Sequence, residues 1–174
     1  MSVKQKTPSD VYDDWKNTIE SITMVYDNVL HNQIYPSWAE NMSEIDLKNK
    51  IDNLKIENNC LYTLNMIASI EGFFNNQLVY FNRAKKWPGT LKRAFKSKIN
   101  KKEYINFDNI LDEWGKYDTR TKKRISDLKN FLNYRHWLAH GRHWKIHYWN
   151  IPDPEEVYIL YSEINEIILF NLNL

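Results

Sequence analysis

Cysteine, glycine and proline are scarce in this sequence, and each scarcity excludes a class of protein. The single cysteine among 174 residues, Cys60, excludes an intramolecular disulfide framework and fits a reducing compartment. With four glycines and five prolines, the chain has no flexible linker, low-complexity tract or internal repeat. No apolar run is long enough to span a bilayer, and the first residues lack the apolar core of a signal peptide. We therefore expect a soluble cytoplasmic protein without a membrane partner.

The length and composition indicate one compact globular domain. A chain of 174 residues suffices for one domain, here 1–174, and is short for two. Its hydrophobic fraction of 43% argues against disorder, and the 14% of aromatic residues predict a core of large side chains.

Hydrophobic residues recur at helical spacing through most of the chain, and signals for strands are poor. The pattern predicts an all-α fold, an up-and-down bundle of four to six helices. We expect the first helix to begin at Ser9 or Asp10, and Ser43 to cap a short polar helix. The expected helical segments are approximately 9–31, 43–53, 57–84, 90–99, 107–115, 121–139 and 155–171.

The net charge of +2 conceals an uneven distribution of charge. Residues 9–58 are acidic overall, whereas 83–102 holds nine basic residues and no carboxylate. Trp87 and Phe95 lie among these basic residues, and this mixture suits a phosphate backbone with stacked bases. We expect RNA contacts from the centre of this segment, at Lys92, Arg93 and Lys96. A second basic group is interpreted as a solvated face: Arg120, Lys122, Lys123 and Arg124.

Two charged residues lie on apolar helix faces. At about 100° per residue, Glu71 falls in the middle of the apolar stripe of 57–84, and Arg135 falls in the middle of that of 121–139. Charges at such positions are costly unless they are paired or used. One interpretation is a buried ion pair between Glu71 and Arg135 that fixes how the two helices pack. The other is that Arg135 serves a site.

Histidines cluster immediately after Arg135. His136 and His140 follow it, and Gly141 suits the position just past a helix end. On an ideal helix Arg135 and His140 are roughly 140° apart, so they converge only if the backbone leaves helical geometry near Gly141. A zinc site formed by His136, His140 and either His143 or His147 is the minor alternative, because carboxylates nearby are few. We expect no metal and no cofactor.

The segment Arg135-His136-Trp137-Leu138-Ala139-His140 resembles the Arg-x4-6-His motif of the HEPN superfamily. Glu71, within Ser69-Ile70-Glu71-Gly72-Phe73-Phe74, also resembles the acidic position in an earlier helix of many members. The resemblance in architecture covers most of the chain, and the resemblance in motif covers about a dozen residues.

The resemblance implies a metal-independent endoribonuclease that acts as a homodimer, with two motifs forming one composite cleft. It implies that Arg135 and His140 are the catalytic pair, that His136 is the polar residue of the motif, and that Glu71 supports the site. Many such proteins are toxins or defend against phage, which would add an antitoxin or regulatory protein to the partners. The chemistry agrees, because histidine titrates near neutrality and arginine can bind a developing phosphorane in a fork.

Other interpretations remain open. The chain could instead be a non-catalytic helical module that binds RNA or a partner protein through its basic segment, including a toxin–antitoxin component. Arg142 suits a phosphate contact and a cation at a helix end equally well. Cys60 falls on an apolar stripe and is expected to be an inert packing residue.

Overall fold

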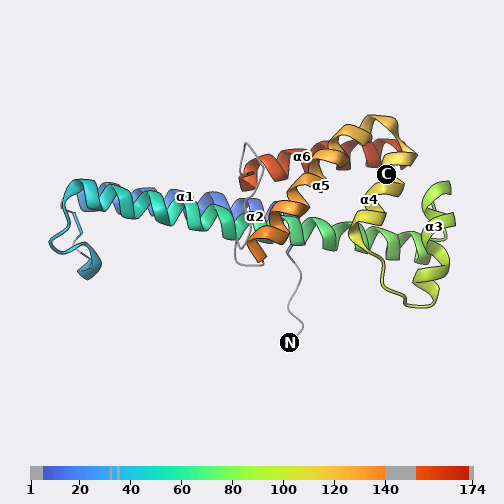
Figure 1. The fold of residues 1–174 in the computed structure, drawn as a ribbon, viewed down its shortest axis with the longest axis horizontal. Coiled ribbons are helices and arrows are strands. Elements are labelled where there is room, and N and C mark those ends of the chain that lie inside the picture. The colour runs from blue at the N-terminus through green and yellow to red at the C-terminus, as the bar shows by residue number, and fades with distance from the viewer. Residues whose placement is uncertain (1–5, 32, 35, 140–151, 173–174) are drawn as a thin grey trace.

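The structure, a computed structural model, describes residues 6–31, 33–34, 36–139 and 152–172. This part of the chain forms six α-helices and one short 3-10 helix, without a strand, which confirms the all-α prediction (Figure 1). The elements are α1 (Pro8–Leu30), η1 (Ser37–Ala39), α2 (Glu44–Ala84), α3 (Gly89–Asn100), α4 (Phe107–Tyr117), α5 (Thr119–Ala139) and α6 (Pro154–Leu172).

Polar side chains begin five of the described helices, and for α5 and α6 these are Asp118 and Asp153, which accept from the amides of Arg120 and Glu156. The first helix starts earlier than predicted, because Thr7 rather than Ser9 or Asp10 is its cap: Thr7 Oγ1 accepts from the Asp10 amide at 3.2 Å, and Asp10 accepts in return from the Thr7 amide at 2.8 Å. Ser43 caps α2 as predicted, by accepting from the Asp46 amide at 3.1 Å. Asn106 caps α4 in the same way.

The second helix is continuous, and the prediction of two helices at 43–53 and 57–84 was wrong. α2 runs unbroken for 41 residues, and its apolar face changes direction along the way. Leu47 and Ile51 pack in a small cluster with Val29 of α1, whereas Met66, Ile67 and later residues pack in the main core. Ile51 and Ile67 are about 160° apart around the helix, so the hydrophobic periodicity breaks at a point where the helix continues.

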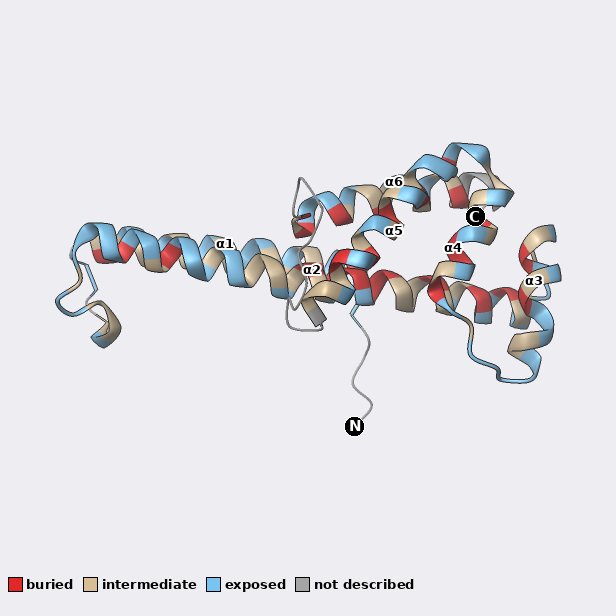
Figure 2. Ribbon diagram, in the orientation of Figure 1, coloured by how far each residue is buried: buried red, intermediate tan, exposed pale blue. Residues whose placement is uncertain are grey.

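The first part of α2 and α1 lie side by side as a long arm, and the second part of α2 runs through the body formed by α3 to α6 (Figure 1). Buried residues are concentrated in the body and form a thin line along the arm (Figure 2). The fully buried centre of the body includes side chains from α2, α4, α5 and α6: Phe74, Ile70, Trp114, Leu128 and Ile164. No helix in the described residues has the length and apolarity needed to cross a membrane.

α5 places the expected motif against α2. Ile125, Leu128 and Leu132 are buried on the face predicted to be apolar, while Phe131 and Leu138 are partly buried. α5 packs against α2, α4 and α6, and its last turns reach the middle of α2. The fold thereby brings Arg135 to the helix that carries Glu71.

Candidate functional site

Arg135 and Glu71 form a direct ion pair between α5 and α2. Arg135 Nη1 donates to Glu71 Oε2 over 2.7 Å. The side chains remain 33% and 24% exposed respectively, so the pair lies at the rim of the core. The predicted pairing is confirmed, but its burial is partial.

The local sequence explains why the pair lies at the rim. Ile67 and Phe74, which flank Glu71 on the α2 stripe, are fully buried, as is Tyr134 beside Arg135. These apolar neighbours fix the two backbones, and the longer charged side chains extend from them toward solvent. Each charge thus gains a partner without losing all of its hydration, which makes the pairing less costly than full burial.

Within the described part of the chain, the guanidinium has donors that form no hydrogen bond to a side chain. Among the described residues, Glu71 is the one side chain that hydrogen-bonds it. Arginine carries five N–H donors in a planar fork, and the bond to Glu71 uses one of them. A phosphate that approaches the exposed part of the side chain would therefore meet donors that are already oriented by the carboxylate.

His136 does not share a face with the ion pair. Its side chain is exposed on α5, about 100° around the helix from Arg135, and no described contact joins the two residues. Trp137, which follows it, stacks on Tyr134 with ring centroids 5.6 Å apart. The other predicted residues, His140 and Arg142, lie outside the described residues, as do Gly141, His143 and His147.

The basic segment presents its charges to solvent but packs its aromatic rings against the body. Lys92, Arg93 and Lys96 are exposed on α3, at the end of the molecule opposite the tip of the arm, and form no ion pair with described residues (Figure 1). Phe95, by contrast, is 3% exposed and belongs to the core, and Trp87 packs on Phe81 with centroids 6.0 Å apart. For Phe95 the expectation of stacking on bases was wrong, because its ring attaches α3 to the core, while Trp87 is partly buried against the body.

The second basic group behaves as a solvated face. Arg120 pairs with Asp118 at 2.7 Å, and Arg124 pairs with Glu163 of α6 at 2.6 Å. Both arginine side chains remain well exposed, and Lys122 and Lys123 face solvent. Ion pairs with Asp118 and Glu163 offset the charge of the two arginines, while Lys122 and Lys123 remain exposed to solvent.

Metal-binding and nucleophilic groups are sparse where the chain is described. Within those residues no three His, Cys, Asp or Glu side chains come together as metal ligands. Cys60 is partly buried, with Sγ 3.6 Å from the Tyr134 hydroxyl, which agrees with its predicted packing role. The zinc alternative combined His136 with histidines outside the described ranges and stays a prediction.

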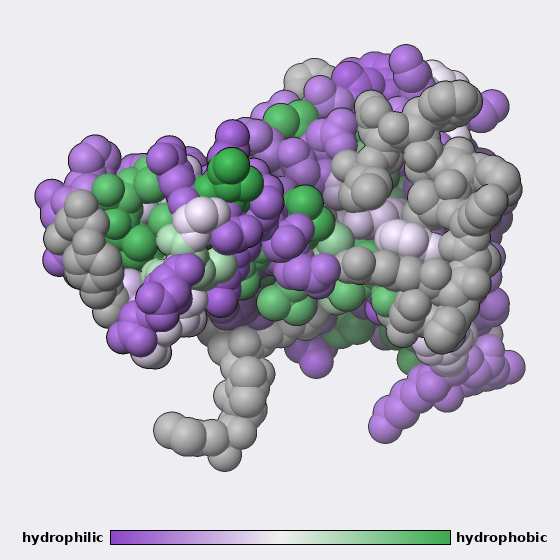
Figure 3. All heavy atoms as spheres, turned by 60° about the vertical axis from the view of Figure 1, so that its left-hand side comes forward, coloured by the Kyte–Doolittle hydropathy of each residue, from purple (hydrophilic) through white to green (hydrophobic). Residues whose placement is uncertain are grey.

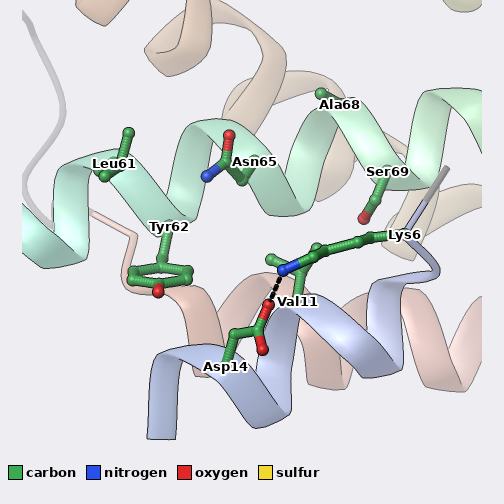
Figure 4. Close-up of a pocket in the computed structure, with 8 residues that line it drawn as sticks. All are labelled: Lys6, Val11, Asp14, Leu61, Tyr62, Asn65, Ala68 and Ser69. Atoms are coloured by element: carbon green, nitrogen blue, oxygen red, sulfur yellow. Dashed lines mark hydrogen bonds and ion pairs between the residues drawn. The ribbon is translucent and has the colours of Figure 1, made fainter. Parts of the chain in front are cut away.

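A hollow beside α1 and α2 has no signal in the amino-acid sequence. This cavity of about 390 Å³ has Lys6 paired with Asp14 on one side and Leu61, Asn65 and Ala68 of α2 on the other (Figure 4). Its residues are separated by up to about sixty positions, so only the folded chain brings them together.

No protein-family model, curated protein or solved structure matches this chain.

Proposed function

We propose that this chain is a metal-independent endoribonuclease of the HEPN type that acts on RNA as a homodimer. The observation that supports it best is the Arg135–Glu71 pair: a guanidinium held at 2.7 Å by a carboxylate, yet one-third exposed. A purely structural arginine would gain most from complete hydrogen bonding in the interior. A partly exposed guanidinium in a fixed position suits a group that binds an anion.

The proposed chemistry is attack of the RNA 2′-oxygen on the adjacent phosphorus. A base removes the 2′-hydroxyl proton, the P–O5′ bond breaks, and an acid protonates the leaving 5′-oxygen, which leaves a 2′,3′-cyclic phosphate. His140 is proposed to transfer these protons, since imidazole titrates near neutrality. Arg135 is proposed to stabilise the negative charge of the phosphorane, and His136 to contact the substrate from the exposed face of α5.

Glu71 has a positioning role in this scheme. Its carboxylate fixes one edge of the guanidinium, which reduces the rotamer freedom that Arg135 would lose on binding a phosphate. It also offsets part of the positive charge of the guanidinium. The site would then favour a phosphorane-like anion that accepts two hydrogen bonds from Arg135 over a distant phosphate that interacts through charge alone. Arg142 is proposed as a further phosphate contact.

The basic surface of α3 is proposed to bind the RNA backbone away from the site. Lys92, Arg93 and Lys96 are exposed and unpaired within the described residues. Glu71 and the end of α2 at Ala84 are about 20 Å apart along the helix, so these contacts would hold a neighbouring part of the strand. Their contribution is electrostatic and independent of sequence.

RNA cleavage by purified variants tests the proposal. In EDTA, the wild type should cleave single-stranded RNA, and Arg135→Ala and His140→Ala should each reduce the rate by at least about a hundredfold. Arg135→Lys should restore little, because lysine lacks the fork. Arg124→Ala is the matched control: it removes an arginine from the same helix, and its rate should equal that of the wild type. Cleavage that requires a divalent metal, or that survives both substitutions, would refute the proposal.

A toxin or phage-defence role is the proposed biological setting, with an antitoxin or regulatory protein as partner. An RNA-cleaving toxin should arrest growth when it is expressed alone, and Arg135→Ala should remove the arrest without changing the amount of protein. Equal growth arrest by the wild type and by Arg135→Ala would show that toxicity does not depend on RNA cleavage.

A second candidate is a non-catalytic module that binds RNA or a partner through α3. The observation that favours it is the contrast between the two regions: no described residue pairs with Lys92, Arg93 or Lys96, whereas the positive charge of Arg135 is already offset by Glu71. In that case the Arg135→Ala variant would bind RNA as the wild type does, and no preparation would cleave it.

A further inference from the structure

One side of α2 carries a line of residues that no other described element covers. Leu54, Leu61 and Val79 are 40%, 53% and 39% exposed, and Ala68 is exposed between them. Steps of seven, seven and eleven residues keep these four side chains within about 40° of one another around the helix. The residues four positions after Leu54, Leu61 and Ala68 have small or amide side chains and complete the line: Asn58, Asn65 and Gly72.

Close to its middle, this line borders the hollow described above. Leu61, Asn65 and Ala68 project from the same side of α2, while Tyr62 and Ser69 lie toward α1 (Figure 4). Tyr62 is tied to α1 by a 2.9 Å hydrogen bond between its hydroxyl and that of Thr18. The side of α2 that faces α1 is therefore occupied, and the line of residues faces outward beside the hollow.

The charges of the molecule are segregated along the same helix. Residues 8–58, which contain α1 and the arm part of α2, hold ten carboxylates and four lysines. Beyond the other end of the line, residues 83–102 hold nine basic residues and no carboxylate. Figure 3 shows the molecule with the arm turned toward the viewer, where hydrophobic groups reach the surface among polar ones.

We propose that a second copy of this chain packs on this line, with the two α2 helices antiparallel. An antiparallel pair places the acidic arm of each copy beside the basic end of the other, whereas a parallel pair would place like charges together. Six of the seven residues of the line pair with one another about a single two-fold axis, as a two-fold interface requires, and Asn58 is the exception. With the two-fold axis between Asn65 and Ala68, Leu61 faces Gly72 of the second copy and Leu54 faces Val79, so large side chains meet smaller ones.

This arrangement would also bring two candidate sites together. Glu71 is about 80° around α2 from Leu61. The two-fold axis lies in the interface and is perpendicular to both helices. Equivalent residues of the two copies therefore lie on the same side of the helix pair. Both Arg135–Glu71 pairs would then border one cleft near the axis. This last step rests on the proposed ribonuclease function, whereas the interface itself rests on the line of residues and the charges.

Molar mass by light scattering and sedimentation tests the interface on the full chain. The wild type should be a dimer, and Leu61→Glu and Ala68→Glu should each weaken dimerisation by at least about tenfold. Ile56→Glu is the matched control: Ile56 is 56% exposed on the same helix but about 140° from Leu61, and this variant should dimerise as the wild type does. A monomeric wild type, or a dimer insensitive to Leu61→Glu and Ala68→Glu, would overturn the proposal.

Cysteine cross-linking tests the orientation. In a Cys60→Ala background, Ala68→Cys should form a disulfide between copies under mild oxidation, and Ile56→Cys should not. Cross-linking through position 56 but not position 68 would assign another face.

RNA cleavage by the variants used for molar mass separates the two proposals. A Leu61→Glu monomer that cleaves at the wild-type rate would refute the composite cleft but not the enzyme. An inactive wild-type dimer would refute the enzyme but not the interface.

Discussion

Arg135 Nη1 lies 2.7 Å from Glu71 Oε2 and so joins the last turns of α5 to the middle of α2. The pair is intermediate between a surface salt bridge and a buried one, because both side chains keep between one-quarter and one-third of their exposure. A surface pair contributes little, and a buried pair leaves a costly unpaired charge when one partner is removed. The stability of variants therefore measures how far the site is solvated.

A double-mutant cycle should show direct coupling between these two residues. Arg135→Ala and Glu71→Ala should each lower the free energy of unfolding by about 1–2 kcal/mol, and the double variant should lose less than their sum by about 1 kcal/mol. Urea denaturation gives the four values. The exposed pair Arg124 and Glu163 is the control, and its coupling should be no more than about 0.5 kcal/mol. Strict additivity at Arg135 and Glu71 would contradict a pair that persists in solution.

Reversing the charge of α3 should weaken RNA binding and its dependence on salt. Loss of three phosphate contacts in the variant Lys92→Glu, Arg93→Glu, Lys96→Glu should lower the slope of log affinity against log salt by about 2 for single-stranded RNA. Fluorescence anisotropy at several salt concentrations measures it. Lys122→Glu with Lys123→Glu is the control, since it reverses exposed lysines on another helix. An equal loss in the control would indicate a general charge effect instead of a binding surface.

Phe95→Ala should destabilise the protein without removing an RNA contact. The ring is 3% exposed in the core, so its loss should cost about 3–5 kcal/mol of unfolding free energy. At a temperature where the variant remains folded, its RNA affinity should match that of the wild type. A loss of affinity at unchanged stability would instead assign the ring to base stacking.

The sequence predicted the helices well where each apolar stripe keeps a single direction. α4 and α5 match their expected segments within two residues at each end, because their buried faces stay on one side. α2 was divided in two because its stripe faces α1 along the arm and the body further on. Hydrophobic periodicity reveals a helix that packs against the same neighbour along its whole length. Where the neighbour of α2 changes from α1 to the body depends on the tertiary structure.

The candidate site was predictable in its pairing but not in its setting. A charge in the middle of each stripe was enough to match Glu71 with Arg135. Whether the pair would be sealed depended on how far α5 overlaps α2, and sequence periodicity carries no such distance. Trp87 and Phe95 show the same limit, since a basic neighbourhood does not reveal that both rings attach α3 to the core.

Tyr161 should make the protein sensitive to alkaline pH. Burial, and secondarily the nearby Tyr158, raises the pKa of its hydroxyl from 10.0 to about 12, because the ring packs against Phe73 and is 8% exposed. The folded form then keeps a proton that the unfolded chain loses near pH 10.0. The stability that this contributes is complete below that pH and is lost as the pH rises toward about 12. Tyr161→Phe has no proton to lose, so its unfolding free energy should fall less steeply over this range, by up to about 3 kcal/mol. The difference between the tyrosinate absorbance titrations of the wild type and Tyr161→Phe should have its midpoint at about 12, and a midpoint near 10.0 would mean that water reaches the hydroxyl in the folded protein.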